Sequence, residues 1–128
     1  MADASPWIAI VDDDASVLKA LTRLLRAHAF RTEAYVSARE FLAALPDATP
    51  DCLILDLQMP DISGLELLHR LTGKGLAIPT IIITAQGDAA IRQRCDSMGA
   101  IAFLTKPLQD SALFAALDKM KPNTSKTG

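Results

Sequence analysis

The chain is organised around Cys52-Leu53-Ile54-Leu55-Asp56 (CLILD), four apolar residues that end at a carboxylate. An apolar run without polar alternation indicates a strand that is covered on both faces, as in a parallel sheet. Similar runs occupy residues 8–11 (IAIV), 80–83 (TIII) and 101–104 (IAFL). Residues 32–36 (TEAYV) are more polar and predict an edge strand. The sequence therefore predicts five strands.

Amphipathic stretches separate these strands and predict helices. Two of them begin at Ser37 and Ser63, each followed three residues later by a glutamate, which is the spacing of a capping box. A third is expected to end near Gly99, where a left-handed cap favours glycine. In the first stretch the apolar residues form one stripe at helical spacing, with basic residues turned away from it. That stripe consists of Val17, Leu18, Leu21, Leu24 and Leu25.

Strands that alternate with helices predict an α/β fold, here a doubly wound, five-stranded parallel sheet with helices on both faces. At this size we expect the flavodoxin-like strand order 2-1-3-4-5, although periodicity alone does not fix the order. The length of 128 residues, half of them apolar, predicts one domain with one core. We expect this domain over residues 1–121, and a flexible tail or linker start over residues 122–128.

Composition and charge argue against several classes of protein. The formal net charge of −2 gives no reason to expect direct nucleic-acid binding by this segment. The sequence has no apolar stretch long enough for a membrane span, and residues 1–6 lack the features of a signal peptide. The two cysteines, Cys52 and Cys95, lie in apolar segments and are expected to be reduced core residues. We therefore expect a cytoplasmic protein without a membrane partner.

Acidic side chains follow two of the predicted strands at their carboxyl ends, where open α/β sheets form their ligand crevices. Asp12 and Asp13 follow the first strand, and Asp56 ends the third. If these strands are neighbours, the three carboxylates converge, and a hard divalent cation such as Mg²⁺ relieves their repulsion. Taken singly, each of these aspartates would equally well cap a helix or end a strand. Asp14 is expected to be the N-cap of the first helix.

Two further strand ends carry groups suited to a phosphoryl ligand. Lys106 follows the fifth strand and offers a point charge to a phosphoryl oxygen. The bond to Pro107 is one that a protein can hold in the cis form, which would aim the lysine inward. Thr84 ends the fourth strand and offers a hydroxyl, although threonine is also simply a good strand former. These residues together favour metal-assisted phosphoryl chemistry.

Four pieces of the sequence resemble the response regulator receiver family of bacterial two-component systems. The resemblance extends over nearly the whole chain, from residue 8 to about 120. Its most distinctive piece is D-x-x-M-P-x-x-x-G, from Asp56 to Gly64. Residues 83–88 are most similar to receivers that precede helix-turn-helix domains, which implies a role in transcription regulation. The other pieces are Val11-Asp12-Asp13, Ile83-Thr84-Ala85 and Phe103-Leu104-Thr105-Lys106-Pro107.

The resemblance implies a phosphorylation-dependent signalling switch and not a turnover enzyme, with at most slow autodephosphorylation. Asp56 would accept a phosphoryl group from a histidine kinase or a phosphotransfer protein. Asp12, Asp13 and Asp56, with the backbone carbonyl of Gln58, would hold Mg²⁺, or Mn²⁺ in its place. Lys106 would contact a phosphoryl oxygen. These roles would make the strand ends a single phosphoacceptor site.

The resemblance also implies how the signal would leave this site. Thr84 would reorient toward the phosphoryl group, and Phe103 would move between exposed and buried positions as Thr84 shifts. The face of the fourth and fifth β/α units would rearrange, and in the family this face often forms a homodimer or docks a partner. Gln58 and Gln86, two residues after Asp56 and Thr84, would tune water access and hence the lifetime of the phosphoryl group.

Three other functions compete with this interpretation. A metal-dependent phosphatase of the haloacid-dehalogenase type also forms an aspartyl-phosphate, but it needs a second aspartate where this chain has Gln58. A flavin-binding module would need a glycine- and hydroxyl-rich phosphate loop after the first strand, whereas Asp12 and Asp13 would repel a phosphate. An inert interaction domain with the same fold is the third alternative. It would take no phosphoryl group from a small phosphodonor.

Overall fold

The computed structural model describes residues 7–46, 49–85, 87 and 89–120, and strands and helices alternate strictly along these ranges. Gln86 and the predicted tail at residues 122–128 lie outside the described residues. The strands are β1 (Trp7–Val11), β2 (Arg31–Tyr35), β3 (Cys52–Asp56), β4 (Thr80–Thr84) and β5 (Ala100–Thr105). The helices are α1 (Ala15–Ala27), α2 (Ala38–Ala44), α3 (Gly64–Gly73), α4 (Ala89–Ser97) and α5 (Asp110–Met120).

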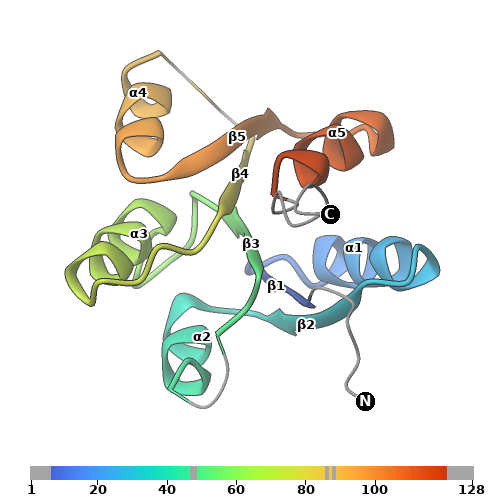
Figure 1. Cartoon of the computed structure of the whole chain (residues 1–128), viewed down its shortest axis with the longest axis horizontal. Coiled ribbons are helices and arrows are strands. Elements are labelled where there is room, and N and C mark those ends of the chain that lie inside the picture. Colours follow the sequence, from blue (N-terminus) through green and yellow to red (C-terminus); the bar gives the residue numbers. More distant parts are fainter. Residues whose placement is uncertain (1–6, 47–48, 86, 88, 121–128) are drawn as a thin grey trace, which may run out of the picture.

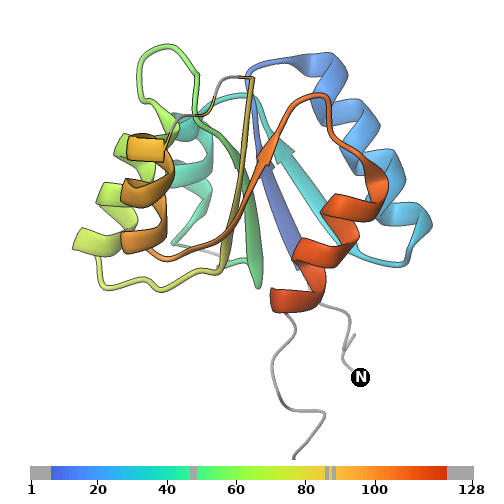
Figure 2. The ribbon, with the colours of Figure 1, turned by 90° about the horizontal axis from the view of Figure 1, so that it is seen from above.

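The five strands form one parallel sheet in the order β2-β1-β3-β4-β5, which confirms the predicted fold and strand order (Figure 1). β3 lies in the centre, with Ile54 paired to Ile10 of β1 and Leu55 paired to Ile82 of β4. Because all the strands run in the same direction, their carboxyl ends share one edge of the sheet. That edge is uppermost in Figure 2.

Helices cover both faces of the sheet, and each face has its own apolar cluster. α2, α3 and α4 pack on one face, and α1 and α5 pack on the other (Figure 1). Along β3 the side chains alternate between the clusters, since Leu53 and Leu55 face α2–α4 while Cys52 and Ile54 face α1 and α5. Both destinations are apolar, which explains why the sequence of β3 shows no polar alternation.

The two edge strands differ from the central ones in burial. β2 lies at one edge, as its polar sequence predicts, and most of its residues are at least partly exposed. β5 lies at the other edge, and no residue of it is fully buried although its sequence is as apolar as that of β3. Burial of a strand depends on its place in the sheet, which its own sequence does not state.

Local hydrogen bonds begin the helices where the sequence predicts. The Asp14 carboxylate accepts from the backbone N–H of Ser16 at the start of α1. The hydroxyls of Ser37 and Ser63 accept from the N–H groups three residues later, at the starts of α2 and α3. After α4, Gly99 has a φ of 100°, a left-handed conformation that glycine adopts without strain.

Two further predictions concern cysteines and membranes. Cys52 and Cys95 are buried and free, and they lie in the clusters on opposite faces of the sheet. The sheet therefore separates them, which agrees with the prediction of reduced core residues. Among the described helices, none has the length and apolar character that a membrane span requires.

Candidate functional site

Three carboxylates converge at the carboxyl ends of β1 and β3. Asp12, Asp13 and Asp56 each offer one oxygen, and these oxygens all lie within 4.8 Å of one another. β1 and β3 are neighbours, so that the ends of the two strands lie side by side. Asp12 and Asp56 are buried, while Asp13 is exposed. This set of hard oxygen donors, open on one side to solvent, fits a divalent cation that keeps part of its water shell.

Backbone and side-chain contacts hold Asp12 in place. Its N–H donates to the carbonyl of Tyr35 on β2 (3.1 Å), and its Oδ1 accepts from the N–H of Asp14 (2.9 Å). Its Oδ2 accepts from the ammonium of Lys106 (3.0 Å). Asp12 has no exposed surface, so these bonds replace the water that the carboxylate loses on burial.

Lys106 brings a positive charge into the acidic cluster from the end of β5. Its Nζ lies 3.0 Å from Asp12 Oδ2 and 3.6 Å from Asp56 Oδ2, and its side chain is 23% exposed. The backbone N–H of Lys106 donates to the carbonyl of Thr84 (2.8 Å), and its bond to Pro107 is cis, as predicted. Burial lowers the pKa of Lys106, but the hydrogen bond that it donates to Asp12 and the charges of Asp12 and Asp56 outweigh this effect, so the net shift of the pKa is upward. Lys106 is therefore a fixed cation within reach of two carboxylates.

Asp56 is the carboxyl whose proton affinity the site changes most clearly. Burial, and then the charge of Asp12, raise its pKa from 3.8 to about 6. The N–H of Gln58, which donates to Asp56 Oδ1 (3.2 Å), and the charge of Lys106 oppose this shift. At neutral pH the group is a carboxylate in an electrostatically unfavourable place. A bound cation or the transfer of an electrophile to its oxygen would relieve that cost.

This shift predicts how the stability of the metal-free protein depends on pH. In the unfolded chain Asp56 titrates near 3.8, whereas in the folded protein it titrates near 6. Between these values the folded state holds a proton that the unfolded state has released, so the contribution of Asp56 to the free energy of unfolding falls as pH rises from about 4 to about 6. Urea unfolding in EDTA, with wild type and Asp56→Asn compared at each pH, isolates this contribution. A difference between the two proteins that stays constant over this range would contradict the prediction.

The connection from β3 to α3 approaches Asp56 so closely that only glycine fits at its end. The N–H of Gly64 donates to the carbonyl of Leu57 (3.0 Å). A Cβ on Gly64 would overlap the carbonyl oxygen of Asp56 and would lie 2.7 Å from the Cα of Leu57. Sequence reasoning found Gly64 as part of a motif but gave no physical role to it. The signal that was available is a glycine at the first position of a helix whose N-cap is already supplied by Ser63.

An ion pair with α2 also holds the connection from β3 to α3, and the sequence analysis did not predict it. Asp61 has a φ of 69°, a left-handed conformation that is unusual for a residue with a side chain. Its carboxylate accepts two hydrogen bonds from Arg39 of α2, at 2.7 Å and 3.1 Å. The hydrogen bond from Arg39 and its charge lower the pKa of Asp61. The pair joins residues 22 positions apart, and no local pattern marks it.

The two residues expected to relay a signal lie on β4 and β5. Thr84 ends β4, is fully buried and pairs with Thr105 of β5. Phe103 pairs with Ile82 and is half-buried. Thr84 thus lies at the carboxyl end of its strand, as the aspartates and Lys106 do, whereas Phe103 lies within β5, opposite the middle of β4; Gln86 lies outside the described residues. The roles assigned to them remain predictions.

Comparison with known proteins gives one family throughout. A family model described as "Response regulator receiver domain" matches residues 8–118. The transcriptional regulatory protein FixJ of Rhizobium meliloti (strain 1021) is 38% identical over 110 residues, which cover 86% of this chain and 54% of that protein. The response regulator protein TmoT of Ectopseudomonas mendocina is 39% identical over 117 residues, which cover 91% of this chain and 53% of that protein.

Solved structures agree with these sequence comparisons. The crystal structure of FixJ-N superposes with a TM-score of 0.82 at 37% identity and covers 94% of each chain. A response regulator receiver protein from Burkholderia phymatum superposes with a TM-score of 0.79 at 42% identity and covers 91% of this chain and 94% of that one. The chain spans about half the length of the curated relatives that it matches.

Proposed function

The chain belongs to the response regulator receiver domain family, and from this premise we propose that it is a phosphorylation-dependent switch with Asp56 as phosphoacceptor. The phosphoryl donor is the phosphohistidine of a histidine kinase or a phosphotransfer protein. One observation carries the proposal. Lys106 Nζ lies 3.0 Å from Asp12 and 3.6 Å from Asp56, inside a cluster of carboxylates that fits a divalent cation.

The transfer needs positioning and charge neutralisation more than bond-making machinery. An oxygen of Asp56 attacks phosphorus, the bond from phosphorus to the donor imidazole nitrogen breaks, and the freed imidazole takes a proton from water. The N–H of Gln58 contacts Asp56 Oδ1 (3.2 Å) and Lys106 faces Oδ2, so the carboxylate is held from both sides. Lys106 then stabilises an oxygen of the transferred group. Mg²⁺, or Mn²⁺ in its place, held by the three aspartates and the carbonyl of Gln58, would neutralise charge on the phosphoryl oxygens.

The output of the switch is carried by β4, β5 and their helices. We propose that Thr84 bonds the phosphoryl group and that Phe103 changes position with it, so that the face of the fourth and fifth β/α units forms a homodimer or docks a partner. The match to the relative named as a transcriptional regulatory protein covers 54% of that protein. We therefore propose that such an output acts on transcription through a helix-turn-helix domain and that this segment itself does not bind nucleic acid.

A turnover phosphatase is the alternative that a single residue argues against. Such an enzyme would need an acid or base beside the acyl phosphate, two residues after the nucleophile. Gln58 occupies that position and supplies a backbone N–H to Asp56. Its side-chain amide does not titrate, so Asp56 stores a phosphoryl group instead of passing it rapidly to water.

Phosphorylation by a small donor tests the proposal. With acetyl phosphate and Mg²⁺, we expect an intact-mass gain of one phosphoryl group, and borohydride should convert the modified residue at position 56 to homoserine. EDTA should prevent the gain. Asp13→Asn should raise the Mg²⁺ concentration for half-maximal phosphorylation about tenfold or more. Removing a metal ligand should lower the metal affinity at least as much as removing a residue that only orients a ligand.

Asp14→Asn is the matched control, since Asp14 is the adjacent aspartate and asparagine caps a helix equally well. We expect its Mg²⁺ dependence to equal that of wild type. Failure of the wild type to gain mass, or a gain on another residue, would reject the proposed function and favour an inert interaction domain. Multiple turnovers of a small phosphate ester would favour the phosphatase.

A further inference from the structure

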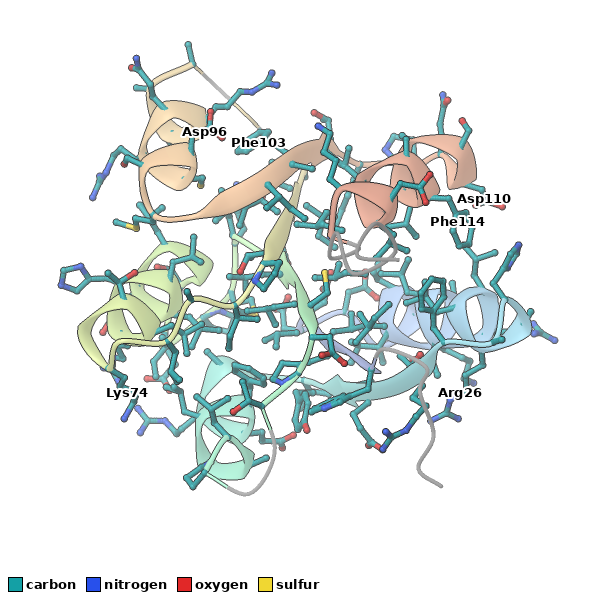
Figure 3. The ribbon with its side chains drawn as sticks, in the orientation of Figure 1. Arg26, Lys74, Asp96, Phe103, Asp110 and Phe114 are labelled. Atoms are coloured by element: carbon teal, nitrogen blue, oxygen red, sulfur yellow. The ribbon has the colours of Figure 1, made fainter. Side chains whose placement is uncertain are left out.

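The aromatic ring of Phe103 lies between α4 and the segment that leads into it. The guanidinium carbon of Arg92 on α4 lies 5.8 Å from the ring centroid, within the range of a cation–π contact. On another side the ring meets Gly87, where an added Cβ would lie 2.6 Å from the ring Cε1 and 3.6 Å from the Thr84 Cγ2. Figure 3 shows Phe103 on β5, near α4. Arg92 of α4 and Gly87 thus both lie against this ring of β5.

We propose that Arg92 is a positioning residue for Phe103: its guanidinium holds the ring against Gly87 and thereby ties α4 to β5. The inference rests on the proposed function, because it concerns the equilibrium between two positions of this ring. Beyond that function, it is Arg92 that shifts the equilibrium between the two positions of the ring. Arg92 is exposed and lies on α4, outside the cluster of Asp12, Asp13 and Asp56, so it acts through Phe103.

The weak attachment of α4 gives this contact its importance. Of the nine residues of α4, only Cys95 is buried, whereas α3 buries Leu67, Leu68 and Leu71. An element with few buried apolar contacts is the one that moves at low cost. The Arg92–Phe103 contact joins the first half of α4 to the sheet. Ile91 also packs against the apolar cluster on this face, so Ile91 and the Arg92–Phe103 contact together hold that end of the helix.

Gly87 acts on the same ring from the other side. A methyl group at this position cannot coexist with the ring where it lies, and the ring, at the far end of a flexible side chain, is the part that must move. Gly87→Ala adds repulsion and Arg92→Ala removes attraction, so both should deplete the same position of Phe103. The same added Cβ would lie 3.6 Å from the Thr84 Cγ2, an ordinary van der Waals contact, so the clash falls on the ring and not on Thr84.

Thermodynamic linkage extends this effect to the phosphoacceptor. If ligation of Asp56 changes the population of the ring position, then a substitution that shifts this equilibrium changes the affinity for the ligand, by at most the factor by which it changes the equilibrium constant. A cation–π contact at an exposed site contributes enough to change an equilibrium about two- to fivefold. The sign of the affinity change depends on whether the free or the ligated protein shows the contact between Phe103 and Gly87. If the free protein shows it, loss of the contact raises the affinity; if the ligated protein shows it, loss of the contact lowers the affinity.

NMR on protein with selectively labelled phenylalanine tests the inference. In wild type we expect nuclear Overhauser contacts between the Phe103 ring and the Gly87 α-protons, strong either without or with beryllofluoride and Mg²⁺. Arg92→Ala should lower the equilibrium constant for this contact about two- to fivefold in the state that shows it, and its population should fall accordingly. It should also change the affinity for beryllofluoride by up to a similar factor, in the direction that favours the state without the contact. For both measurements, Arg92→Lys should give values between those of wild type and Arg92→Ala.

Arg94→Ala is the matched control, because Arg94 is an exposed arginine of the same helix, and it should leave both readouts unchanged. In a Phe103→Leu background, Arg92→Ala should no longer change the beryllofluoride affinity. Absence of the contact in both states of wild type, an unchanged population in Arg92→Ala, or an affinity shift that persists without the ring would each overturn the inference. A wild type that binds no beryllofluoride would instead reject the proposed function, while the ring contact in the free protein would still test Arg92.

Discussion

In Asp56→Asn, we expect the gain of a phosphoryl group to disappear while the metal-free protein becomes more stable at neutral pH, by about 1–3 kcal/mol. The two effects have one cause. Asp56 is 3% exposed, and burial and the charge of Asp12 raise its pKa to about 6, so its ionised form is costly at pH 7. Asparagine keeps the shape and an acceptor for the N–H of Gln58, but it carries no charge and cannot attack phosphorus.

Intact mass after acetyl phosphate and urea unfolding in EDTA at pH 7 measure the two effects. Asp118→Asn replaces an exposed carboxylate of α5 and should change neither. Saturating Mg²⁺ should narrow the stability gap, because the cation binds the folded wild type more tightly than the variant that lacks one carboxylate. A variant that is less stable than wild type, or one that still gains the phosphoryl mass, would contradict this account of the site.

The carboxylate cluster thus costs stability until a ligand neutralises it, and much of this could be predicted from the sequence. Strand ends in a parallel sheet share one edge, so the order of apolar runs could place Asp12, Asp56 and Lys106 at the same edge. That they converge depends on the strand order, which periodicity alone does not fix. The caps at Asp14 and Ser37 could be predicted because their hydrogen bonds span two or three residues. In each case the physical cause lies within a short segment or in a general property of the fold.

Contacts between distant side chains could not be predicted in this way. The pairing of Arg39 with Asp61 and the position of Arg92 over Phe103 join segments that neither periodicity nor capping relates. The half-burial of β5 depends on its place at the edge of the sheet and not on its own composition. These contacts depend on the packing of complete side chains, whereas sequence patterns report which face of an element is apolar.

Gly64 is the position where backbone packing next to the phosphoacceptor should be least tolerant. We expect Gly64→Ala to lower the free energy of unfolding by about 1–3 kcal/mol or more, because an added methyl group would overlap the carbonyl oxygen of Asp56 and crowd the Cα of Leu57. Both are backbone atoms at the end of a central strand, so no side chain can rotate away. The start of α3 and the end of β3 must separate instead.

This separation should also slow phosphorylation, since it moves Asp56 and the N–H of Gln58 relative to Lys106. A misplacement of about 1 Å can cost about a hundredfold in rate, and we expect the initial rate of mass gain from acetyl phosphate to fall at least tenfold. Gly73→Ala is the matched control, because Gly73 lies in the same helix and an added Cβ meets nothing within 4 Å. It should keep the wild-type rate of phosphorylation. Its free energy of unfolding should rise by up to about 1 kcal/mol, because alanine lowers the backbone entropy of the unfolded chain. If Gly64→Ala matched Gly73→Ala in both measurements, close approach of the backbone would not be what requires glycine at this position.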